Sequence, residues 1–114
     1  MKRVILFALI LLSACKAKLP DIPGNVIPME KMELILADMH IADAVAETKA
    51  QMGMSEQLIV QEYHEQIFIN HGVTRAEFLS SYKFYQDNPK LMDIMYDKIL
   101  ADLSKREQET GKQK

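Results

Sequence analysis

A chain of 114 residues has the length of one small domain. Its 14 basic and 16 acidic side chains give a formal net charge of −2, so it lacks the positive excess with which nucleic-acid-binding proteins engage phosphates. The single cysteine, Cys15, excludes a disulfide framework and a cysteine-based zinc site. Because the glycines are isolated from one another, no phosphate-binding loop and no cofactor are expected.

The N-terminus has the organisation of a secretory signal. Two basic residues, Lys2 and Arg3, precede an unbroken apolar run at 4–12. Nine residues are too few for a transmembrane helix, which needs about 20, but they suit the apolar region of a signal peptide. The run ends in LSAC, which resembles the bacterial lipobox. We therefore expect cleavage between Ala14 and Cys15, which removes residues 1–14 and frees Cys15 for acylation.

The residues after the cleavage site bear on where the protein is anchored. Bacterial lipoproteins resemble one another in carrying three acyl chains, and two or more chains attach a protein stably to a membrane. Lys16 follows the cysteine, which by analogy with enterobacterial sorting favours the outer membrane. The segment 16–18 lacks the acidic run associated with surface export. We expect a lipid-anchored protein in the cell envelope, on the periplasmic side of the outer membrane.

The mature chain is expected to begin with a linker and continue as helices. Residues 15–27 include Pro20, Pro23 and Gly24 and predict a short extended tether that carries the lipid. A helical domain is predicted over 28–107 and a polar, frayed tail over 108–114.

Helix start and stop signals divide that domain into four segments. The first helix is predicted from Pro28 to residue 51 and the second from Ser55 to residue 71, each followed by a glycine. Thr74 and Glu77 have the spacing of a capping box at the start of a third helix, over 74–87. The fourth helix begins at Asn88-Pro89 and runs to about Glu107. The pattern predicts an all-α fold, a small bundle of about four helices whose neighbours pack antiparallel or at tight corners.

The apolar residues of each segment recur at helical spacing. The first helix has the widest apolar arc, which predicts a central helix in contact with more than one neighbour. The residues expected to face the core are Met32, Leu34, Ile35, Met39, Ala42, Val45 and Ala46 in the first helix, Ile59, Val60, Tyr63 and Ile67 in the second, Phe78, Tyr82 and Tyr85 in the third, and Leu91, Met92, Met95, Tyr96, Ile99 and Leu103 in the fourth.

Two polar features of the first helix allow more than one interpretation. His40, Asp43, Glu47 and Glu33 share one side of it, where they form either a divalent metal site or an ordinary solvated surface. Asp38 projects into the apolar arc, where a carboxylate needs a partner. It either bonds a neighbouring helix end or a tyrosine hydroxyl at a seam between helices, or it is an acid with a perturbed pKa. His71 at a helix C-terminus is explained by the helix dipole.

Several apolar side chains lie off the core stripes. Leu58 and Ile69 project from the acidic side of the second helix, Phe68 is also off its stripe, and Phe84 points away from Phe78, Tyr82 and Tyr85. Together they form either a partner-binding patch or positions that a neighbouring helix covers. We expect Leu58, Ile69 and Phe84 to contribute to a partner surface.

Several motifs along the chain resemble a family of Bacteroidetes lipoproteins, domain of unknown function 4296. The residues that carry the resemblance are the lipobox at 12–15, IP at 27–28, MELILADMH at 32–40, FINHGVT at 68–74, Phe78, Ser81, Tyr82, Tyr85, NP at 88–89, MYD at 95–97 and Leu103. The resemblance implies no activity and no catalytic residues, because the family has none assigned.

These observations favour a non-enzymatic binding or assembly module, held at the membrane by lipid and engaging a protein partner. A second hypothesis is a periplasmic chaperone-like module that holds unfolded clients in a methionine-rich groove, since the chain has eight methionines. A third is a cryptic metal-binding protein or hydrolase. A persistent complex with a single partner would favour the first hypothesis. Protection of many unfolded proteins would favour the second, and stoichiometric metal in the purified domain would favour the third.

Overall fold

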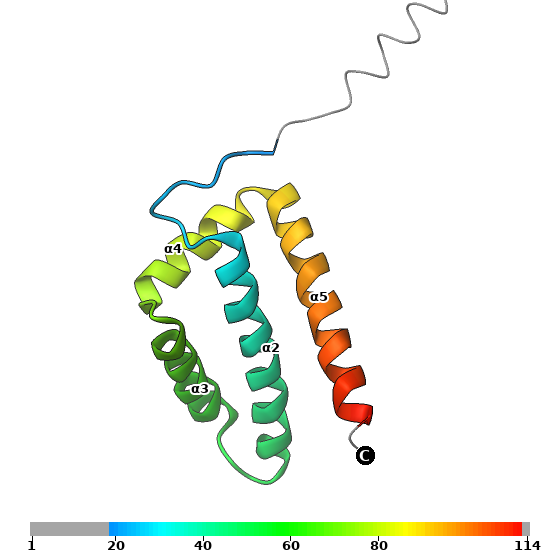
Figure 1. The fold of residues 1–114 in the computed structure, drawn as a ribbon. Coiled ribbons are helices and arrows are strands. Elements are labelled where there is room, and N and C mark those ends of the chain that lie inside the picture. The colour runs from blue at the N-terminus through cyan, green and yellow to red at the C-terminus, as the bar shows by residue number, and fades with distance from the viewer. Residues whose placement is uncertain (1–18, 113–114) are drawn as a thin grey trace, which may run out of the picture.

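The computed structural model describes residues 19–112, which form four helices: α2 (Met29–Gln51), α3 (Glu56–His71), α4 (Arg75–Gln86) and α5 (Pro89–Lys112). α2 lies between α3 and α5, and α4 crosses the end of the bundle at which α2 begins (Figure 1). α3 runs antiparallel to α2, whereas α5 runs in the same direction as α2. The predicted all-α bundle and the central place of the first helix are confirmed.

The local signals for helix ends act as expected, with two differences. Thr74 Oγ1 accepts a hydrogen bond from the Glu77 amide at 3.1 Å, and Glu77 Oε2 accepts one from the Thr74 amide at 2.8 Å, which completes the capping box. Gly72 follows α3 with φ +66°, a left-handed conformation that glycine adopts without strain. Ser55 occupies the N-cap of α3 but makes no side-chain capping bond. The fourth helix runs to Lys112, past the predicted end near Glu107, so 108–112 is helix rather than frayed tail.

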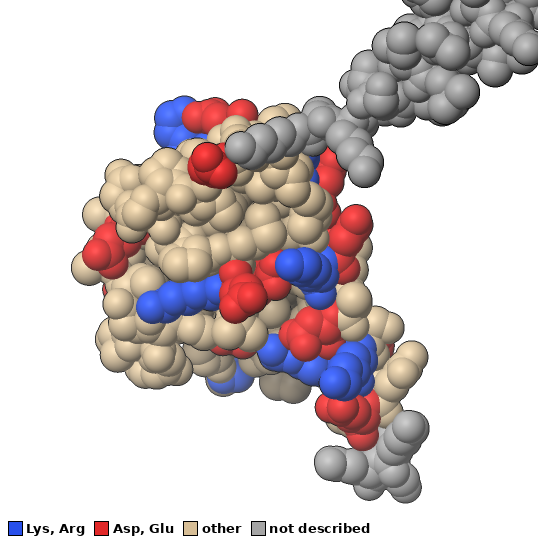
Figure 2. All heavy atoms as spheres, turned by 45° about the horizontal axis from the view of Figure 1, so that its top comes forward, with Lys and Arg blue, Asp and Glu red and all other residues tan. Residues whose placement is uncertain are grey.

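Charged side chains are dispersed over the surface. Figure 2 shows acidic and basic residues interspersed on the face that it displays, in keeping with the near-neutral composition. Among the helices of residues 19–112, none is long and apolar enough to cross a membrane.

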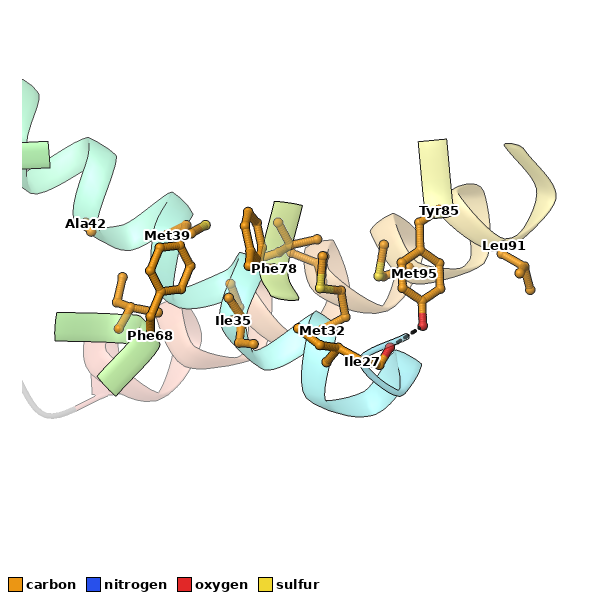
Figure 3. Close-up of a cluster of buried hydrophobic side chains, with 14 residues drawn as sticks. Ile27, Met32, Ile35, Met39, Ala42, Phe68, Phe78, Tyr85, Leu91 and Met95 are labelled. Atoms are coloured by element: carbon orange, nitrogen blue, oxygen red, sulfur yellow. Dashed lines mark hydrogen bonds between the residues drawn. The ribbon is translucent and has the colours of Figure 1, made fainter. Parts of the chain in front are cut away.

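The core lies between α2 and the other three helices. Met32, Ile35, Met95 and Ile99 are almost fully buried there, as the apolar stripes predicted. Phe68 packs against Phe78 with ring centroids 5.1 Å apart (Figure 3). Phe68 is 3 % exposed, so its assignment to a position off the core is wrong: Phe68 belongs to the end of α3 that α4 covers.

The buried side of α2 is rotated about the helix axis relative to the apolar arc that was predicted to face the core. Leu34 and Val45 are 49 % and 39 % exposed, whereas Leu36 and Ala37 are buried in their place. Periodicity fixes the width of an arc, but the positions of α3 and α5 decide which part of it is covered.

Part of the predicted tether belongs to the domain. The Ile27 carbonyl accepts a hydrogen bond from the Tyr85 hydroxyl at 2.7 Å (Figure 3). The Ile27 amide donates to Ser81 Oγ at 2.9 Å. Ile27, Ser81 and Tyr85 are all buried, and Ile22 and Val26 pack against the same core. Burial, and secondarily the Glu33 carboxylate, raise the pKa of Tyr85, which keeps its hydroxyl protonated as a donor. The prediction of an extended tether over 15–27 is therefore wrong for its last part, which α4 fixes in place.

Candidate functional site

The predicted seam position of Asp38 is confirmed. Asp38 Oδ2 lies 2.7 Å from His71 Nε2 at the C-terminal end of α3, and Asp38 Oδ1 lies 3.7 Å from Arg106 Nη1 of α5. Arg106 also pairs with Asp102, one turn earlier on α5, at 2.9 Å. We call these four residues the Asp38 network: Asp38, His71, Arg106 and Asp102. The network links α2, α3 and α5. Asp38 is 39 % exposed, so each of these pairs is worth little in free energy, and the network mainly sets the position of its groups.

A groove lies beside the Asp38 network, between α2 and α3. We call it the α2–α3 groove; its volume is about 320 Å³. Its walls are lined by Asp38, Ile41, Ala42, Val45, Tyr63, Gln66, Ile67 and Asn70. Ile41 and Val45 are 42 % and 39 % exposed there, so the groove presents apolar carbon to solvent. Gln66 donates to Asn70 at 2.9 Å and forms a polar rim on the α3 side.

The two ends of the α2–α3 groove carry opposite charges. Asp38 closes one end, with His71 bonded to it. Lys49 stands at the other end, where its Nζ donates to the Tyr63 hydroxyl at 2.5 Å and lies 5.1 Å from the centre of the Tyr63 ring. These two distances place the ammonium group beyond the hydroxyl, at the edge of the Tyr63 ring.

Sequence reasoning missed this groove. Ile41 and Lys49 were not among the predicted partner residues, and Leu34 and Val45 were placed in the core. The signal was present in the spacing of Leu34, Asp38, Ile41 and Val45, which share one side of α2 at intervals of three and four residues. That side remained outside the core because neither α3 nor α5 covers it fully.

The predicted partner residues have different environments. Leu58 and Ile69 are 68 % and 69 % exposed on the outer side of α3, so they are surface residues as expected. Phe84 is half-buried, packs against the core, and meets the Tyr85 ring edge-on at 5.4 Å between centroids. The expectation that Phe84 stands apart from the core is therefore wrong, whereas its contribution to a partner surface stays a prediction. The structure does not bring the three residues together as one site.

The acidic side of α2 does not assemble as a metal site. Asp43 pairs with His64 of α3 at 3.0 Å, Glu33 lies 3.6 Å from Lys98 of α5, and His40 packs edge-on against Tyr96. Within residues 19–112, no three His, Cys, Asp or Glu side chains are grouped closely enough to hold a metal ion. The polar residues of this helix side instead have separate partners on two neighbouring helices.

Tyr82 and Tyr96 join α4 to α5 through their hydroxyls, which lie 3.5 Å apart. The hydrogen bond with Tyr82, in which the protonated Tyr96 hydroxyl is the donor, and, to a lesser extent, burial raise the pKa of Tyr96 to about 12. A folded state that holds this proton more tightly than the unfolded chain loses stability as the proton is removed.

We therefore expect stability to fall as the pH rises from 10 to about 12, because the unfolded Tyr96 then ionises before the folded one. Tyrosinate absorbance, compared between the parent protein and Tyr96→Phe, should show Tyr96 titrating late. Tyr82→Phe should bring the pKa of Tyr96 back towards its usual value. Titration of Tyr96 near pH 10 in the folded parent protein would contradict the assignment.

The lipobox and the cleavage site lie outside the described residues 19–112, as does Cys15.

In comparisons with known proteins, no curated protein and no solved structure matches this chain significantly. A family model, domain of unknown function (DUF4296), matches residues 23–109. The match begins ahead of α2 and includes Ile27, so the segment that α4 holds lies within the family's domain. Because the model covers more than half of the chain, this protein belongs to the DUF4296 family.

Proposed function

We propose that this protein is a lipid-anchored, non-enzymatic binding module of the bacterial cell envelope. In this proposal, acylated Cys15 attaches it to the outer membrane on the periplasmic side, and the α2–α3 groove engages a protein partner. The observation that carries the proposal is the exposed apolar wall of the groove, formed by Ile41 and Val45. Exposed apolar surface in a small domain marks interaction sites when it is contiguous and has a polar rim, as here.

The anchoring half of the proposal depends on the sequence. A basic start, a nine-residue apolar run and LSAC at 12–15 are the features that a lipoprotein signal requires. Lys16 and the absence of an acidic run at 16–18 support the periplasmic side of the outer membrane. The described domain adds a short connection, since Ile22 already packs against the core.

A chaperone-like role receives less support than a role with one partner. Such a role would use methionines as adaptable groove walls, but Met32, Met39 and Met95 are buried in the core. Met52 and Met54 are exposed, at the turn between α2 and α3, and neither is among the residues that line the α2–α3 groove. The large apolar side chains that line the groove are instead Ile41, Val45, Ile67 and Tyr63, and the limited rotamer freedom of the three β-branched residues suits one defined partner.

Photo-crosslinking in intact cells tests the proposal. A photo-crosslinking amino acid at position 41 should give one discrete adduct, because the α2–α3 groove holds one partner. The same group at position 100 is the matched control, since Leu100 is an exposed aliphatic residue on α5 and does not line the groove. A broad set of adducts from position 41 would favour the chaperone-like role. Identical products from both positions would contradict a partner site at the groove.

A further inference from the structure

The shape of the α2–α3 groove restricts what can occupy it. Its α2 side is lined by Asp38, Ile41, Ala42 and Val45, of which Asp38, Ile41 and Val45 follow one another at spacings of three and four residues. This is the spacing with which one helix meets another, because residues three and four apart project from the same side. The opposite wall is a second helix, α3, antiparallel to the first. A groove between two packed helices has the form that accepts the apolar side of a third.

The length of the groove sets the length of the occupant. Asp38 lines one end of the groove, and Lys49 lies one turn beyond Val45 at the other end, where it contacts the lining residue Tyr63; the two are eleven residues apart on α2. At 1.5 Å per residue this is about 16 Å, or about three helical turns. The volume of about 320 Å³ is at the lower limit for a small-molecule pocket, which is usually enclosed on most sides. Ile41 and Val45 stay about two-fifths exposed, so the space is an open channel.

The charges at the two ends give the occupant a direction. At one end the carboxylates of Asp38 and Asp102 share the guanidinium of Arg106, and Asp38 also contacts His71, whose neutral imidazole would leave this end with one net negative charge. At the other end the ammonium of Lys49 forms no salt bridge within residues 19–112 and donates a hydrogen bond to the Tyr63 hydroxyl. A helix carries about half a positive charge on its free N–H groups at the N-terminus and about half a negative charge at its C-terminus. A bound helix with its N-terminus at Asp38 places its positive end by a carboxylate and its negative end by the Lys49 ammonium.

We propose that the α2–α3 groove binds an amphipathic helix of about three turns from the partner, parallel to α2, with its N-terminus at Asp38 and its C-terminus at Lys49. This deepens the proposed function and rests on it. The occupant needs apolar residues at intervals of three and four that fit between Ile41, Val45 and Tyr63. A second copy of this chain is a poorer occupant, because its own exposed α2 row has the Asp38 carboxylate in the middle.

The experiment uses the full-length lipidated chain in nanodiscs and a synthetic helical peptide of four turns. The peptide has leucine at helical intervals of three and four, alanine and glutamine elsewhere, and neutral terminal caps. Fluorescence anisotropy measures its binding. Ile41→Ser and Val45→Ser should each weaken binding about tenfold, as loss of an anchor residue does. Leu58→Ser and Ile69→Ser are matched controls from the outer side of α3 and should change binding by less than about twofold. All four side chains are substantially exposed, so each variant should keep the parent unfolding temperature.

A benzophenone at either end of the same peptide tests the direction. The N-terminal label should crosslink near Asp38 and Asn70, and the C-terminal label near Lys49 and Tyr63. Lys49→Glu should weaken binding of this peptide. The reverse crosslinking order, or an Ile41→Ser variant that binds as well as the parent, would overturn the proposal. So would displacement of the peptide by a fatty acid, or a dimer crosslinked through Ile41.

The two proposals fail separately. If the peptide does not bind but position 41 still gives one adduct in cells, the partner engages the groove through another structure and only the helix is wrong. If position 41 gives no adduct at all, the partner site itself is wrong.

Discussion

Tyr85→Ala is expected to lower the free energy of unfolding by about 3–5 kcal/mol, the usual cost of removing a buried aromatic side chain. The Tyr85 side chain is 0 % exposed, and its hydroxyl satisfies the buried Ile27 carbonyl. Its removal therefore opens a cavity and at the same time releases the segment that precedes α2. Urea unfolding followed by circular dichroism measures the change.

Two further variants on α4 dissect this effect. Tyr85→Phe keeps the ring but leaves the Ile27 carbonyl unpaired, which should cost about 1–3 kcal/mol. Leu79→Ala, at a position 55 % exposed on the same helix, should change stability by less than about 0.5 kcal/mol. If Tyr85→Ala were as mild as Leu79→Ala, the placement of Tyr85 in the core would be wrong.

Cys15→Ser is expected to abolish acylation and release the protein from the membrane fraction, or leave it with an uncleaved signal. The physical reason is that serine lacks the thiol on which the lipid is built, and the rest of the anchoring energy comes from the acyl chains. Metabolic labelling with an alkyne-tagged palmitate, followed by fractionation, measures both effects. Ser13→Ala keeps a small residue in the lipobox and should be labelled as the parent is. Undiminished labelling of the Cys15→Ser variant would refute the anchor.

The sequence predicted those features of the fold that depend on nearby residues. Thr74 and Glu77 determine where α4 begins because the capping box closes within four residues. Gly72 ends α3 for an equally local reason. Asp38 could be placed at a seam from the cost of leaving a carboxylate alone in an apolar arc.

The features that were missed depend on distant residues. Prolines and a glycine indicate an extended segment before α2, but the Ile27 backbone bonds to Ser81 and Tyr85 across more than 50 residues of sequence. The periodicity of α2 could not tell whether Leu34 or Ala37 is covered, because that depends on where α5 packs. The same uncertainty hid the α2–α3 groove, which exists only because part of the apolar arc is left open.

Because residues 22–27 pack against the bundle, the linker between the proposed lipid and the folded domain is short. Only the six residues 16–21 lie between Cys15 and Ile22, and even fully extended the seven steps from Cys15 to Ile22 span about 24 Å, less than the length of about 34 Å expected for the 23 residues of α2. If Cys15 carries the proposed lipid, the domain would therefore be confined to a thin layer beside the bilayer. A partner anchored in the same membrane would meet it at the millimolar effective concentration typical of short tethers, so a weak intrinsic affinity of the groove suffices for high occupancy.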